Sequence, residues 1–185
     1  MKNLEIYIHI PFCVRKCEYC DFLSFPADDD TKLRYVKGLM AEMIFYGPLM
    51  KNYQVSSVYI GGGTPSSIDE QWIAALMEGV FDCFNVLPDA EISIECNPGT
   101  LSREKLLAYR DAGINRLSIG LQSANNDELK LLGRIHTFEQ FVTNYEVARN
   151  VGFKNINVDL MYGLPGQSAS QYMATVNKII RLHPD

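Results

Sequence analysis

The chain has 185 residues, of which 47% are hydrophobic and 21% are charged, and its formal net charge is −5 at pH 7. This composition is ordinary for a globular protein of one domain with a sizeable core. The acidic balance argues against a general nucleic-acid or anionic-membrane surface. No apolar run approaches the roughly 20 residues that a membrane-spanning helix needs, so no transmembrane segment is expected.

Strand and helix patterns alternate along the chain. We predict strands over 4–10, 55–60, 90–96, 116–122 and 155–160, and helices over 31–47, 69–84, 102–112, 137–151 and 169–182. Gly113 and Gly152 are each predicted to stop a helix in the left-handed conformation. We interpret the acidic run 28–30 as a solvated loop before the first helix. The alternation is typical of βαβ units and a parallel sheet.

Four of the five predicted strands have one apolar and one polar face. In the first strand, the apolar face carries Leu4, Ile6, Ile8 and Ile10, and the opposite face carries Glu5, Tyr7 and His9. A parallel sheet covered by helices on both faces should instead be apolar on both. A closed barrel normally fills its interior with apolar side chains. We therefore predict an α/β fold, a partial TIM-like (β/α) barrel with a polar interior that holds a ligand, in preference to a doubly wound sheet.

Three cysteines, Cys13, Cys17 and Cys20, lie close together directly after the first predicted strand. These spacings allow one loop to wrap three thiolates around a single metal centre. Three ligands are one too few for structural zinc or for a fully ligated cubane. A 4Fe–4S cluster held by three cysteines leaves one iron without a protein ligand. Such an iron is free to bind and activate another molecule, which indicates a catalytic rather than a purely structural centre.

Two alternatives remain for these cysteines. A disulfide is disfavoured because nothing else in the sequence indicates secretion. A zinc site that takes His9, Cys83 or Cys96 as its fourth ligand is the stronger rival. Cys83 and Cys96, however, lie in apolar stretches, and we predict that both are core residues. No signal peptide is expected before or within the first strand, so we expect a cytoplasmic protein.

Polar residues also stand at the ends of the other predicted strands. Parallel strands bring these ends to one rim, where such folds keep their chemistry. The rim carries the glycine-rich stretch 61–65, Glu95, Gln122 and Asp159. The glycines allow close approach of a ligand but match no phosphate-binding pattern. In the loop-like stretch 132–136, Arg134 is a candidate for neutralising a ligand carboxylate, whereas His136 has no partner spacing that suggests a metal pair.

The spacing Cys-x3-Cys-x2-Cys with Tyr19 before the last cysteine, followed by Gly-Gly-Gly-Thr-Pro, resembles the radical S-adenosylmethionine (SAM) superfamily. The stretches 7–13, 94–98 and 117–123 look like its anaerobic coproporphyrinogen III oxidase branch and the related haem chaperones. Matches run from residue 7 to 167. The resemblance implies that residues 1–185 are a radical SAM core domain with five βα units of an expected six.

The same resemblance implies a 4Fe–4S cluster on Cys13, Cys17 and Cys20, whose open iron chelates SAM and whose electron cleaves it to a radical. It implies no catalytic residue beyond the cluster and cofactor ligands. The positions that match cofactor contacts are Tyr7, Tyr19, Gly62, Gly63, Thr64, Glu95, Gln122, Arg134 and Asp159.

Two departures separate the branches. The oxidase has a further cysteine where this chain has Phe22, and a long N-terminal arm where only residues 1–3 precede the first strand. Both favour a haem chaperone over an oxygen-independent coproporphyrinogen III dehydrogenase of haem biosynthesis. The partners implied are SAM, haem or porphyrin, a haem-acceptor protein and a reductant such as flavodoxin or ferredoxin. The family's haem-ligand motif lies beyond residue 185 and its members are longer, so we expect this sequence to be part of a longer protein.

Overall fold

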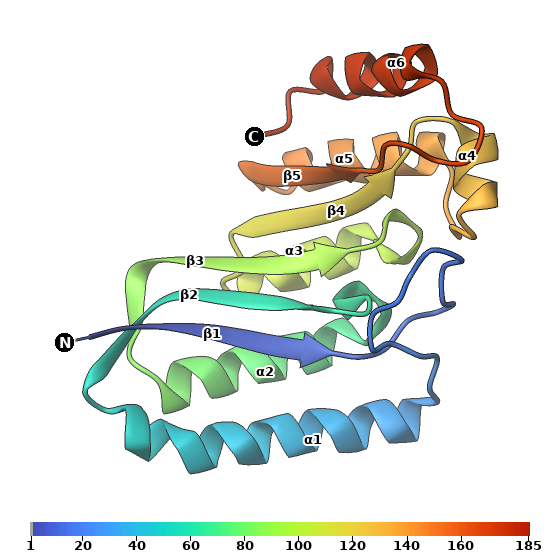
Figure 1. Cartoon of the computed structure of the whole chain (residues 1–185). Coiled ribbons are helices and arrows are strands. Elements are labelled where there is room, and N and C mark those ends of the chain that lie inside the picture. Colours follow the sequence, from blue (N-terminus) through green and yellow to red (C-terminus); the bar gives the residue numbers. More distant parts are fainter. Residues whose placement is uncertain (1) are drawn as a thin grey trace.

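The computed structural model describes residues 2–185, which form a five-stranded parallel sheet with helices packed against it (Figure 1). The strands are β1 (Lys2–Ile10), β2 (Tyr53–Gly62), β3 (Val86–Cys96), β4 (Arg116–Gln122) and β5 (Asn155–Leu160). The helices are α1 (Asp29–Tyr46), α2 (Glu70–Cys83), α3 (Arg103–Asp111), α4 (Asn126–Leu131), α5 (Phe138–Asn150) and α6 (Ala169–Ile180). Three 3₁₀ helices follow α1, β2 and β3: η1 (Gly47–Met50), η2 (Pro65–Ser67) and η3 (Pro98–Thr100).

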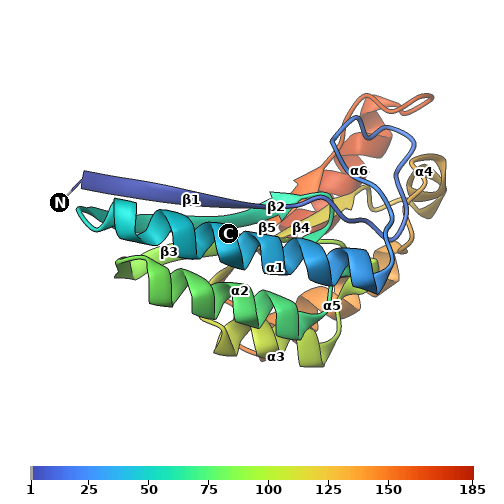
Figure 2. The ribbon, with the colours of Figure 1, turned by 90° about the horizontal axis from the view of Figure 1, so that it is seen from below.

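The strands are arranged in sequence order, β1-β2-β3-β4-β5, and each neighbouring pair is parallel. Each connection between neighbouring parallel strands is expected to be right-handed. When every connection leads to the next strand on the same side, as here, the connecting helices all lie on one face of the sheet. Figure 2 shows α1, α2 and α3 together on one side of the strands. A doubly wound sheet reverses its strand order, so the prediction of a partial barrel is confirmed.

All of the predicted strands and helices are present, with ends displaced by up to four residues. The additional helix α4 has six residues, too few for a periodic pattern to reveal it. The predicted helix stops are confirmed, because Gly113 and Gly152 have φ values of 87° and 99°. The acidic run does more than the predicted solvated loop: the Asp28 carboxylate accepts a hydrogen bond from Thr31 N at 2.8 Å and so caps α1.

The core lies between the apolar face of the sheet and the helices, as the strand patterns predicted. Its fully buried members include Ile10, Val58, Ile60, Ile94, Leu117, Ile119 and Ile156 from the strands. In β2, Ser56 is an extra residue, since the register passes from Leu4↔Val55 to Glu5↔Ser57. This bulge lets Val55 and Val58 face the same way, which explains why this strand lacks simple alternation.

The two cysteines predicted to belong to the core do so. Cys96 is buried within the core, and Cys83 is partly buried against it. Among residues 2–185, no helix is long and apolar enough to cross a membrane.

Candidate functional site

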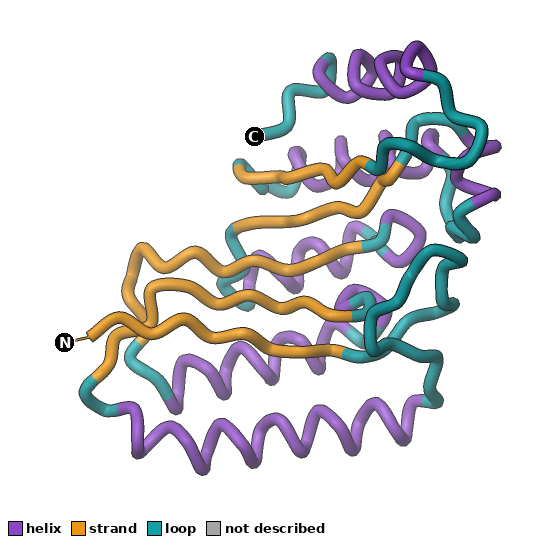
Figure 3. Tube along the Cα trace, viewed as in Figure 1, coloured by secondary structure: helices purple, strands orange, loops and turns teal. Residues whose placement is uncertain are grey.

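The loop that follows β1 is closed at its base by main-chain contacts. Cys13 N donates to Phe25 O at 3.1 Å, and Phe25 N donates to Pro11 O at 2.9 Å. The rings of Phe12 and Phe25 meet edge to face with centroids 5.7 Å apart. Residues 13–24 therefore leave the sheet and return to it as one excursion, which we call the cysteine loop. Figure 3 shows it at the same end of the sheet as the loop between α4 and α5.

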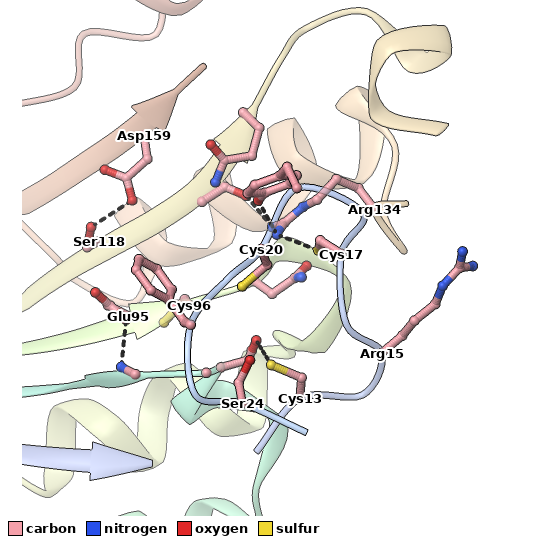
Figure 4. Close-up of a pocket in the computed structure, with 18 residues that line it drawn as sticks. Cys13, Arg15, Cys17, Cys20, Ser24, Glu95, Cys96, Ser118, Arg134 and Asp159 are labelled. Atoms are coloured by element: carbon pink, nitrogen blue, oxygen red, sulfur yellow. Dashed lines mark hydrogen bonds between the residues drawn. The ribbon is translucent and has the colours of Figure 1, made fainter. Parts of the chain in front are cut away.

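The cysteine loop and the ends of β2, β3, β4 and β5 surround one pocket (Figure 4). This site pocket contains every residue that the family resemblance assigned to the cluster or the cofactor, except Tyr7. It is lined by Cys13, Arg15, Cys17, Tyr19, Cys20, Phe22, Ser24, Gly62, Gly63, Thr64, Glu95, Cys96, Asn97, Ser118, Gly120, Gln122, Arg134 and Asp159. The three cysteines of the loop are free thiols.

The glycine stretch, which forms the end of β2 and the turn after it, packs against the base of the cysteine loop. Thr64 N donates to Phe12 O at 2.8 Å, and the Thr64 hydroxyl donates to Cys13 Sγ at 3.5 Å. A Cβ at Gly63 would lie 2.7 Å from Phe12 O, and one at Gly62 would lie 2.7 Å from the His9 ring. These glycines are therefore needed for contact between two loops, in addition to any approach of a ligand.

Glu95 is held in place at the end of β3 by two donors. Tyr59 Oη donates to Glu95 Oε1 at 2.9 Å, and Gly62 N donates to Glu95 Oε2 at 3.0 Å. Burial and the neighbouring carboxylate raise the pKa of Tyr59, so it remains a donor at neutral pH. Sequence reasoning missed Tyr59, although its place on the polar face beside the glycine stretch was a usable signal.

Asp159 is fixed in a similar way on β5. It accepts a hydrogen bond from Ser118 Oγ at 3.2 Å and one from Asn157 Nδ2 at 2.7 Å. Ser118 lines the pocket from β4 and was not among the nominated residues. The two carboxylates, Glu95 and Asp159, therefore enter the pocket already oriented by neutral donors.

Gln122 ends β4 in an unusual backbone conformation. Its φ is 74°, a left-handed value that is costly for a residue other than glycine. The register with β5 shifts between Gly120 and Gln122, so a bulge places the Gln122 side chain at the pocket. Such strain is typical of functional positions.

Arg134 joins the sheet to the cysteine loop. Its Nη2 donates to Gly120 O, and its Nη1 donates to Tyr19 Oη at 3.3 Å and to Cys17 Sγ at 3.5 Å. Its buried Nε has no hydrogen-bond partner among the described residues. An orphaned buried donor of this kind is expected where a polar ligand belongs.

His136 lies behind the pocket, buried, with Nδ1 3.2 Å from Asn97 Oδ1. Burial, together with the charge of Arg134, lowers its pKa from 6.5 to about 4, so it is neutral at physiological pH. Tyr7 stands apart from the pocket on the polar face. It is 58% exposed, stacks on Tyr59 with centroids 6.2 Å apart, and lies 3.1 Å from His9 Nδ1 through its hydroxyl.

Three thiols on one loop at the rim of the pocket suit a cubane cluster. Within residues 2–185, no three His, Cys, Asp or Glu side chains are placed to hold one metal ion. A cubane takes each thiolate on a different iron, so its ligands need not meet at one point. Cys96 is buried and lines the pocket from the end of β3, whereas Cys83 and His9 do not line it.

The fold and site define a radical SAM protein: the sequence profile of the radical SAM superfamily matches residues 7–179, and the chain belongs to this superfamily. Among curated proteins it is similar to the heme chaperone HemW of Escherichia coli, with 38% identity over 187 residues, and to that of Bacillus subtilis, with 38% identity over 177 residues. It is also similar to the oxygen-independent coproporphyrinogen III oxidase of Bradyrhizobium diazoefficiens, with 35% identity over 185 residues.

These alignments cover nearly all of this chain but only part of each relative. They include 98%, 95% and 99% of this chain, and 48%, 47% and 41% of the relatives in the same order. The chain thus spans about half the length of the heme chaperones it matches. The solved structure of coproporphyrinogen III oxidase from Escherichia coli superposes with a TM-score of 0.92 at 34% identity, covering 100% of this chain and 42% of that one.

Proposed function

We propose that this chain is the cluster- and SAM-binding core of a haem chaperone that works in the cytoplasm. In this proposal Cys13, Cys17 and Cys20 bind three irons of a 4Fe–4S cluster. The observation that carries the proposal is the meeting of three free thiols on one loop with fixed polar groups from four strand ends. When bound, the cluster and SAM would supply radical chemistry.

The chain's own polar groups suit the charged, hydroxyl-rich SAM molecule. We assign its binding to Tyr7, Tyr19, Gly62, Gly63, Thr64, Glu95, Gln122, Arg134 and Asp159. Glu95 and Asp159 offer oriented acceptors for hydroxyl or ammonium groups. Arg134 offers an unpaired Nε and a cation for a carboxylate. Tyr7 lies outside the site pocket, so its contact would be made from the exposed polar face.

Haem delivery is favoured over porphyrinogen oxidation by Phe22. Phe22 is 71% exposed and lines the pocket, at the position where the oxidase that the sequence resembles has a cysteine. The most similar curated relatives named above carry the heme chaperone name at 38% identity. The partners in this proposal are haem, a haem-acceptor protein and a low-potential reductant such as flavodoxin or ferredoxin. The alternative is an oxygen-independent coproporphyrinogen III dehydrogenase, which the similarity to the solved oxidase structure favours.

Anaerobic reconstitution with iron and sulfide tests the cluster. We expect about four irons per chain and a broad absorption band at about 400 nm. Cys13→Ser, Cys17→Ser and Cys20→Ser should each abolish that band, whereas Cys83→Ser, at the edge of the core, should retain it. Binding of one zinc ion without any such band would overturn the proposal. Assays of haem transfer and of coproporphyrinogen decarboxylation, on the longer protein that contains this chain, separate the chaperone from the dehydrogenase.

A further inference from the structure

We propose that Arg134 is a positioning residue that acts through Cys17 and raises the reduction potential of the cluster. The inference rests on the cluster assignment proposed above. The Arg134 guanidinium donates to Cys17 Sγ, 117 residues away in the sequence, at 3.5 Å. Figure 4 shows this hydrogen bond crossing from the sheet side of the pocket to the cysteine loop.

The main chain of both loops builds this contact. Gly133 ends α4 with a φ of 72°, and Arg134 N donates to Leu129 O at 2.9 Å. The next link is between loops: Glu18 N donates to Leu132 O at 3.1 Å. A Cβ at Gly133 would lie 3.2 Å from Glu18 Cγ. The turn after α4 is therefore seated on the cysteine loop, and Arg134 leaves it toward Cys17.

The guanidinium group is held from several sides. Gly120 O on β4 accepts from Nη2, and Tyr19 Oη accepts from the Nη1 that also reaches Cys17. A planar group with donors in a fixed fork is suited to such a set of acceptors, whereas a lysine ammonium is a single point charge. Arg134 therefore presents both a charge and a directed N–H to the sulfur.

Charge and hydrogen bonding then favour the reduced cluster. Reduction adds one electron from an external low-potential donor, breaks no bond and leaves the proton on the arginine. The added negative charge is shared with the sulfur ligands, and hydrogen bonds to those sulfurs raise the potential. Glu95 and Asp159 line the same pocket and oppose the added charge, so Arg134 offsets them from the side of Cys17.

Arg15 provides a matched control. It also lines the pocket and lies on the cysteine loop, but its side chain is 59% exposed and pairs with Glu18 at 3.5 Å. Solvent and salt screen such a charge. Arg15→Gln removes the same unit of charge as Arg134→Gln without removing the hydrogen bond to Cys17.

The test is a redox titration of the reconstituted chain with dithionite, followed by electron paramagnetic resonance and made without SAM. For Arg134→Gln we expect about a tenfold lower ratio of reduced to oxidised cluster at a fixed potential, which is a shift of about 59 mV for one electron. Arg134→Lys should shift the ratio in the same direction by less, and it serves as the test if Arg134→Gln does not retain iron. Arg15→Gln should leave the ratio within about twofold of wild type.

An unchanged ratio in the Arg134 variants would overturn the inference, as would an equal shift in Arg15→Gln, which would mean that charge alone is responsible. If the wild-type chain takes up no iron and sulfide, the proposed cluster itself is wrong. Iron content before the titration therefore distinguishes the two failures.

Discussion

At the residue scale, Gly63, directly after β2, shows how the site depends on close main-chain packing. Gly63 N donates to Ile10 O at 2.8 Å, so this residue is tied to the end of β1 as well as to the cysteine loop. A Cβ on Gly63 would lie 2.7 Å from Phe12 O and 3.0 Å from Cys13 Sγ. Main-chain oxygen cannot rotate away as a flexible side chain can, so the added methyl group must displace the loop.

Gly63→Ala should therefore lower both stability and cluster retention. We expect the free energy of unfolding to fall by about 1–3 kcal/mol, as for other overpacked sites, and the iron content after reconstitution to fall with it. Urea unfolding and iron analysis measure the two effects. Gly38→Ala in α1 is the control, because a Cβ there meets nothing within 4 Å, and it should raise stability by roughly 0.5–1 kcal/mol. Normal iron content in Gly63→Ala would contradict this account of the loop.

At the element scale, His136 joins pieces of the structure that are distant in sequence. It follows α4, its Nδ1 faces Asn97 beyond β3, and its ring also lies near the main chain of Leu121 in β4. These contacts hold the α4–α5 turn, which carries Arg134, against the sheet.

Stability should fall in mild acid because of His136. Burial and Arg134 lower its folded pKa from 6.5 to about 4, so the unfolded chain binds this proton more tightly. The contribution of neutral His136 to the free energy of unfolding is fully present above pH 6.5 and is lost as the pH falls from 6.5 to 4. This lowers the free energy of unfolding by up to about 3 kcal/mol. Urea unfolding across this range should give a steeper pH dependence for wild type than for His136→Gln. Equal slopes for the two proteins would show that His136 does not titrate in this way.

Local patterns in the sequence were sufficient to predict the main elements. Alternation within strands identified the face that packs on the helices, and Gly113 and Gly152 marked helix ends. The pattern could not reveal the six-residue α4 or the bulge at Ser56, because neither repeats over a long enough stretch.

The pocket was predictable only as a set of strand ends. Parallel topology brings Glu95, Gln122 and Asp159 to one rim whatever their exact contacts. The pairing of Tyr59 with Glu95 and of Arg134 with Cys17 depends on loop geometry between segments far apart in the chain. Such pairs have no local signature, so one sequence alone did not reveal them.

At the scale of the whole molecule, the sheet has two outer strands within the described residues, β1 and β5. The edge of β5 is partly covered, since Asp185 N donates to Ile156 O at 3.1 Å. The outer edge of β1 pairs with no other strand in the sheet. Lys2 N donates to Asn52 O before β2, and Ile10 O accepts from Gly63 N after it, so the even-numbered residues of β1 direct their main-chain groups toward β2. Successive residues of a strand direct these groups to opposite sides, so the N–H and C=O of Glu5 point away from the sheet.

The chain should therefore associate through the edge of β1, because unpaired strand edges invite pairing with another copy. Light scattering over a dilution series should show an average mass that rises with concentration. Glu5→Pro removes an outward N–H, and proline is tolerated on edge strands, so this variant should shift the average mass toward the monomer while the circular dichroism spectrum stays unchanged. A wild-type chain that remains a monodisperse monomer across the series would show that the exposed edge is not adhesive. Equal association of wild type and Glu5→Pro would place the contact elsewhere on the molecule.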